Sequence, residues 1–164
     1  MMAVSILGEL EHEAAITRKL LERAPEDRFD WKPHEKSMTL GRLASHCAET
    51  LKWLDVIVNQ EVFEMDPGSY TPFQAGSHSE LMEAFDANVE SAKEVMHNQS
   101  DENLLANWKM KTGGQVTLEM PRIGVIRGFV LNHLVHHRGQ LSVYLRLNDV
   151  PVPSIYGPSA DETG

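Results

Sequence analysis

The sequence predicts an all-α fold: a four-helix bundle with long connectors and a short hairpin before the last helix. Apolar residues recur at spacings of three and four along four segments, which is the pattern of amphipathic helices. Stretches rich in proline and glycine separate these segments, and no parallel-sheet pattern interrupts them. A chain of 164 residues is the size of one domain. We therefore expect a single bundle domain over residues 1–164.

The first two helices follow from their apolar stripes. Residues 4–23 carry one stripe, and Pro25 ends that helix. After a polar connector, Thr39 is a suitable N-cap for a second helix. Its stripe begins at Leu40 and continues to Val58.

A long connector precedes the third helix. Residues 64–76 hold two prolines and two glycines, and this segment is long enough to cross the end of a bundle. Ser77 followed by Glu80 has the pattern of a capping box. The third helix is then expected to run to about Asn98.

The last part of the chain predicts a hairpin, a long helix and a loose tail. Residues alternate in character on both sides of Gly113 and Gly114, which is typical of a short hairpin. Pro121 fits the first turn of the fourth helix, which should continue to about Leu147. We expect residues 155–164 to be frayed.

Composition limits the classes of partner. The formal net charge is -9, from 24 acidic and 15 basic residues, so the chain should repel nucleic acids and anionic membranes. The amino-terminal residues lack both a basic leader and a long apolar segment, so we expect a cytoplasmic protein. The only cysteine, Cys47, excludes an internal disulfide. A metal site would have to use histidine or carboxylate ligands.

The most informative motif is LNHLVHHRGQ, residues 131–140. His133 and His137 fall near the middle of the apolar arc of the fourth helix, whereas Arg138 is expected on the opposite side. Because they are four residues apart, the two imidazoles can reach a common point, as paired metal ligands do. For the pair alone, two interior histidines bonded to the backbone or to a buried water are the favoured interpretation. A metal site would need a third ligand.

His46 is the best third ligand. It lies inside the second helix, on the flank of its apolar stripe. Its neighbour Cys47 lies in the centre of that stripe and is expected to be buried and inert. Glu49, Asn132 and Gln140 could support the ligands by hydrogen bonds. The remaining histidines lie in loops, at helix ends or on polar faces: His12, His34, His78, His97 and His136.

These motifs resemble those of a known family. SMTLGRLASHCAE around His46 and NHLVHHRGQLSVYLRLNDVPVPSIYG around His133 and His137 are similar to the DinB/YfiT-like superfamily of bacterial four-helix proteins. The resemblance covers nearly the whole chain. It implies a divalent metal ion, zinc or nickel, held by His46, His133 and His137, often in a homodimer. Similar proteins include thiol S-transferases that use bacillithiol and mycothiol-dependent isomerases.

Three histidine ligands leave a coordination position open for a water or a substrate. A metal ion there could lower the pKa of a bound thiol or water, or polarise a substrate oxygen. The leading hypothesis is therefore a metal-dependent thiol S-transferase that acts on small electrophiles, with a low-molecular-weight thiol as co-substrate and no protein side chain as nucleophile. A non-catalytic, stress-associated metal-binding protein and a metal-dependent hydrolase are the alternatives.

Overall fold

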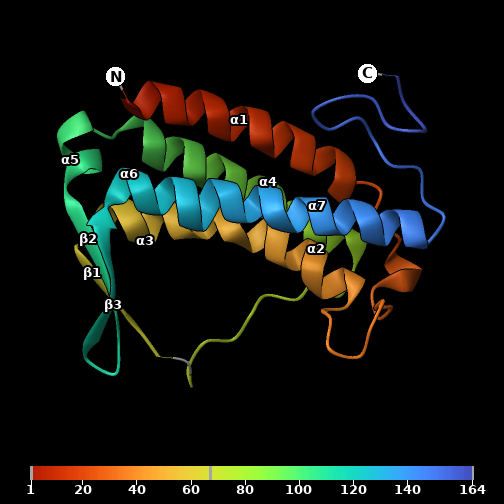
Figure 1. Cartoon of the computed structure of the whole chain (residues 1–164), viewed down its shortest axis with the longest axis horizontal. Helices are drawn as coiled ribbons and strands as arrows, with labels where there is room; N and C mark the ends of the chain where they lie inside the picture. Colours follow the sequence, from red (N-terminus) through yellow and green to blue (C-terminus); the bar gives the residue numbers. More distant parts are fainter. Residues whose placement is uncertain (1, 67, 164) are drawn as a thin grey trace.

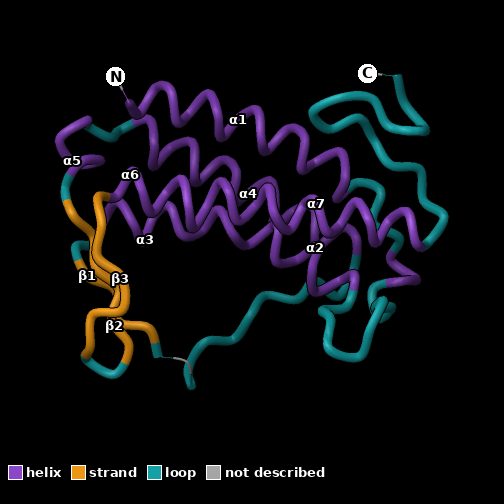
Figure 2. Tube along the Cα trace, in the orientation of Figure 1, coloured by secondary structure: helices purple, strands orange, loops and turns teal. Residues whose placement is uncertain are grey.

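Long helices run side by side, and a small sheet closes one end of the molecule (Figures 1 and 2). The computed structural model describes residues 2–66 and 68–163. Each of the four predicted helical segments is present. The second of them is one rod in two parts, because a 3-10 turn at Thr50–Lys52 joins α2 to α3. The long elements are α1 (Met2–Leu21), α2 (Leu40–Glu49), α3 (Trp53–Asn59), α4 (His78–His97) and α7 (Asn132–Leu147), and short α5 covers Asp101–Leu105.

The prediction of an all-α fold is wrong, because the chain also forms a three-stranded mixed sheet. The strands are β1 (Val62–Met65), β2 (Asn107–Thr112) and β3 (Gln115–Pro121). The hairpin of β2 and β3 was expected, and its turn uses Gly113 and Gly114 with positive φ. The unexpected strand is β1, which pairs in parallel with β2 in a register that sets Val62 beside Lys109. A strand of four residues has too little alternation to be recognised locally, and its partner is remote in sequence.

The capping signals act as the sequence indicates. The Thr39 hydroxyl accepts a hydrogen bond from the Arg42 N–H, which fixes the start of α2. The Ser77 hydroxyl accepts one from the Glu80 N–H at the start of α4. The Glu80 carboxylate accepts from the Gly76 N–H (2.7 Å), one residue before the donor that a standard capping box uses.

The last predicted helix contains a wide turn. It begins as α6 (Arg122–Val125), passes through a π segment over Ile126–Leu131 and continues as α7. A π segment has an extra residue in its turn, so it changes which later residues face the core. The fully buried stripe of α7 passes through Leu134, Arg138, Leu141 and Leu145.

Arg138 is therefore a core residue, not a residue of the polar face as the sequence suggested. It is 1% exposed, and its guanidinium forms an ion pair with the Glu13 carboxylate of α1 (2.7 Å). It also donates to the Tyr156 hydroxyl (2.5 Å), and that hydroxyl donates to Glu13 (2.7 Å). A helical wheel places Arg138 on the polar face because it ignores partners on other helices. A buried charge is acceptable where its partner lies on another helix.

The tail that was expected to fray is held by hydrogen bonds as far as Glu162. Asp161 accepts from the Val152 N–H (2.8 Å) and forms an ion pair with Arg146. Glu162 accepts from the Ser154 N–H (2.9 Å) and pairs with Arg23. The tail thus folds back over the end of α1 and α7, as Figure 1 shows.

Acidification is expected to release this tail. The pKa of Asp161 is lowered, chiefly by its hydrogen bond from Arg146, and the pKa of Glu162 is lowered chiefly by its hydrogen bond from Arg23. Because both pKa values are lower in the folded state, these contacts stabilise fully above the unfolded values of about 4 and weaken as the pH falls through the folded values. The amide chemical shifts of Val152 and Ser154, followed by NMR, should move only below about pH 4. Movement complete by pH 5 would contradict this assignment.

Within the described part of the chain, no helix is both long and apolar enough to cross a membrane.

Candidate metal centre

Three imidazoles meet between α2 and α7. The Nε2 atoms of His46 and His133 are 2.9 Å apart. The ring centroid of His137 lies 4.5 Å from that of His46 and 4.5 Å from that of His133. One ring nitrogen from each histidine lies within 4.8 Å of the others. The structure thus brings together the three residues singled out from the sequence, and they could hold a metal ion.

Local helix geometry explains this meeting. His133 and His137 are one turn apart on α7, so their side chains project in the same direction. His46 lies on α2, which packs directly against α7. All three rings are partly buried, and the side chain of His46 is 21% exposed. The cluster can therefore be reached from solvent while its ligand atoms are held by two helices.

Two hydrogen bonds orient the rings for metal binding. The Nδ1–H of His46 donates to Oε1 of Glu49 (2.9 Å), and the Nδ1–H of His137 donates to Oε1 of Gln140 (2.8 Å). A carboxylate and an amide oxygen only accept, so the proton of each ring is on Nδ1. The lone pair of each of these two rings is then on Nε2, the atom that a metal ion would use, and the His46 Nε2 faces the His133 Nε2.

Glu49 is at the centre of a larger network. Its Oε1 accepts from Arg42 (2.6 Å), and its Oε2 accepts from the Phe73 N–H (2.9 Å). Burial alone would raise the pKa of Glu49, but the hydrogen bonds from His46, Phe73 and Arg42 lower it to about 2. The carboxylate therefore stays ionised and places a negative charge behind the His46 ring.

His133 and His137 are uncharged near neutral pH. Burial lowers the pKa of His133, and the nearby His46 lowers it further. Burial also lowers the pKa of His137, to about 4, although the hydrogen bond to Gln140 acts in the opposite direction. Neutral imidazoles are the form that binds metals, so this environment favours ligation.

The neighbouring candidates divide clearly. Cys47 is fully buried, and burial raises the pKa of its thiol to about 12, so it is unsuited to act as a nucleophile. Glu49 and Gln140 hydrogen-bond the rings of His46 and His137, whereas Asn132 is exposed. Sequence reasoning missed Arg42. Its spacing of four to His46 and seven to Glu49 places all three on one face of α2 and could have revealed it.

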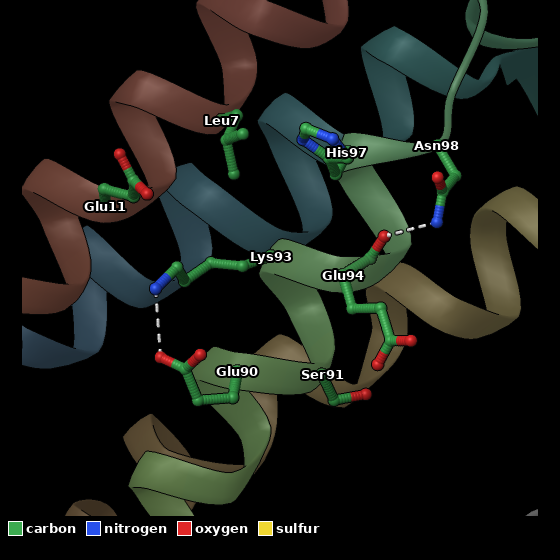
Figure 3. Close-up of a pocket in the computed structure, with 8 residues that line it drawn as sticks. All are labelled: Leu7, Glu11, Glu90, Ser91, Lys93, Glu94, His97 and Asn98. Carbon is green, nitrogen blue, oxygen red and sulfur yellow. Dashed lines mark hydrogen bonds and ion pairs between the residues drawn. The ribbon is translucent and has the colours of Figure 1, made fainter.

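A separate surface pocket shares no residue with the histidine cluster. It has a volume of about 540 Å³ and lies between α1 and the end of α4 (Figure 3). Its polar groups include three glutamates, and Lys93 is paired with Glu90 (3.0 Å). This arrangement is typical of a solvated helix surface, so the histidines mark the candidate site.

The comparisons with known proteins agree with this geometry. A model described as the DinB family matches residues 2–163. The chain belongs to the DinB family. It is 29% identical to YrdA of Bacillus subtilis strain 168, itself described as uncharacterized, over 95% of this chain and 89% of YrdA.

Two solved structures of DinB-like proteins share the fold. The protein from Bacillus cereus ATCC 10987 aligns with a TM-score of 0.69 at 21% identity, over 89% of this chain and 92% of that chain. YjoA from Bacillus subtilis aligns with a TM-score of 0.71 at 19% identity, over 92% of this chain and 96% of that chain. The small sheet is thus part of a chain that is DinB-like over nearly its whole length.

The role of Glu49 can be tested by Glu49→Gln. The amide can still accept from His46, but the negative charge behind the ring is lost. We expect zinc affinity to fall about tenfold, at the lower end of the 10–100-fold range for such supporting groups. Calorimetric titration with zinc would measure this change. Glu90→Gln, at an exposed position of α4, is the matched control, and this variant should bind zinc normally.

Proposed function

We propose that this DinB family protein is a metal-dependent thiol S-transferase that acts on small electrophiles. Its metal ion is zinc or nickel, held by His46, His133 and His137. The observation that carries the proposal is the convergence of three imidazoles within 4.8 Å, with Glu49 and Gln140 fixing the rings of His46 and His137. Imidazole nitrogen suits both metals.

A divalent ion in this position would supply Lewis acidity, lowering the pKa of a thiol co-substrate or polarising the electrophile. In the proposed reaction the thiol sulfur forms a bond to the electrophilic carbon. The bond from that carbon to its leaving group breaks, the leaving group departs with the electron pair, and the thiol proton passes to solvent. The reaction needs neither an oxidant nor a reductant.

The protein's own residues position and shield the reactants. Glu49 holds the Nδ1 proton of His46 and keeps its Nε2 available. Phe129 packs beside the His133 ring, with centroids 5.8 Å apart, and limits access of water from that side. No protein thiol takes part, because Cys47 lies in the core.

Thiol consumption is the direct test. Zinc-loaded and nickel-loaded protein would be incubated with bacillithiol, mycothiol or glutathione and an alkyl halide, and free thiol would be followed with time. We expect consumption with at least one thiol, and none above background with His137→Ala. Consumption of no thiol, combined with tight metal binding, would leave a metal-binding protein without this activity. Metal-dependent ester hydrolysis without a thiol would identify a hydrolase.

A further inference from the structure

A small apolar pocket is lined by Glu49, the carboxylate that accepts from His46 of the histidine cluster. Its volume is about 220 Å³. The side chains around it come from the end of α2, from the turn and α3 that follow, from β1 and from the connector after β1. They are Glu49, Lys52, Trp53, Val56, Phe63 and Tyr70.

Aromatic rings link this pocket to the histidines. The ring of Trp53 packs edge-on against Phe63, with centroids 5.1 Å apart, and against Phe129, with centroids 5.2 Å apart. Phe129 in turn contacts the ring of His133. Glu49 makes the second link, because it lines the pocket and also accepts from His46. The pocket is therefore connected to the histidine cluster through Glu49 directly and through Trp53 and Phe129 indirectly.

Lys52 supplies the positive charge that a ligand bound in the pocket could pair with. The Glu49 carboxylate is occupied by His46, Arg42 and the Phe73 N–H. In contrast, Lys52 is exposed and forms no ion pair with any residue of 2–66 or 68–163. Its ammonium group lies 5.7 Å from the centroid of the Phe73 ring. An anionic group bound here would pair with Lys52 and would meet no uncompensated carboxylate.

The pocket's size narrows its occupant. A volume of about 220 Å³ is below the roughly 300–1,000 Å³ of pockets for drug-sized ligands. Walls of Trp53, Phe63 and Tyr70 favour a planar apolar body over a polar one. A single aromatic ring, or a branched chain of similar size, matches both features.

We propose that this pocket binds a small molecule with one aromatic or compact apolar body and an anionic group that pairs with Lys52. In the proposed S-transferase reaction this molecule is the electrophile, and this assignment of its role rests on the proposed function. A ligand held between Trp53 and Lys52 would lie beside Glu49, the residue that holds the His46 ring. Lys52 is then a specificity-determining residue.

Calorimetric titration of zinc-loaded protein with phenylacetate, benzyl alcohol and benzylamine tests the pocket itself. We expect phenylacetate to bind most tightly and benzylamine least tightly. Lys52→Gln should weaken phenylacetate by about threefold, the size of a solvent-exposed ion pair, and leave benzyl alcohol unchanged. The matched control is Lys19→Gln, an exposed lysine on α1, and it should bind phenylacetate normally. Equal affinity for the three ligands, or a phenylacetate affinity that Lys52→Gln leaves unchanged, would overturn the proposal.

A second variant separates the pocket from the reaction. Val56→Phe should fill the pocket and weaken phenylacetate at least roughly tenfold, while zinc affinity stays normal because no ligand is altered. With α-bromophenylacetate as electrophile, Lys52→Gln should raise KM without lowering kcat. If phenylacetate binds as expected but no thiol is consumed, the proposed function fails and the pocket stands. If thiol is consumed normally by Val56→Phe, the pocket is not the electrophile site.

Discussion

His133→Ala is expected to abolish specific metal binding. The variant leaves two imidazoles from different helices, and loss of a ligand costs more than the 10–100-fold that loss of a supporting hydrogen bond costs. We therefore expect zinc affinity to fall at least about a hundredfold. Elemental analysis of purified protein and calorimetric titration would measure the loss. Zinc should also raise the melting temperature of the unaltered protein, because it binds only the folded state, and should not raise that of the variant.

His136→Ala is the control for this variant, because it removes a neighbouring imidazole. His136 is exposed and is adjacent to His137, but it does not belong to the cluster of ring nitrogens. His136→Ala removes an imidazole from the same turn of α7 and should retain zinc affinity. If the two variants lost zinc equally, the ligand assignment would be wrong.

Arg138→Met is expected to lower the free energy of unfolding by about 3–5 kcal/mol, the cost of breaking a buried ion pair by removing one partner. Arg138 is 1% exposed and Glu13 is 8% exposed, so the variant leaves a carboxylate in the core without its cation. Among residues 2–66 and 68–163, only the Tyr156 hydroxyl would still donate to it. Urea denaturation followed by circular dichroism would measure the change.

A second substitution shows whether the cost comes from the unpaired charge. Glu13→Gln combined with Arg138→Met removes both charges, so the double variant should be more stable than Arg138→Met alone. Arg127→Met removes an arginine from an exposed ion pair with Glu9 and should change stability far less. If Arg138→Met were as mild as Arg127→Met, the buried pair would contribute little to the fold.

The parts of the site that could be predicted are those set by local geometry. His133 and His137 follow from their spacing on one helix, and Thr39 marks the start of the helix that carries His46. The pairing of α2 with α7 is not visible in the periodicity of either segment. The choice of His46 therefore needed its position on the stripe and the family resemblance.

The features that were missed depend on partners far along the chain. β1 forms because its backbone hydrogen-bonds to β2, and the four residues of β1 alone carry no pattern that indicates this pairing. Arg138 is accepted in the core because Glu13, on another helix, neutralises it. Fixation of the tail likewise depends on Arg23 and Arg146. Each case is a tertiary interaction that overrides a local preference.

The π segment over Ile126–Leu131 lies between the hairpin and the histidines of the cluster. If these six residues were wound as an ordinary α-helix, with no change in their number, His133 and His137 would be rotated by about 100° relative to β3. Either the sheet or the histidines would then be out of phase with the rest of the chain. The wide turn thus acts as an angular offset of about one residue between the sheet and the histidines.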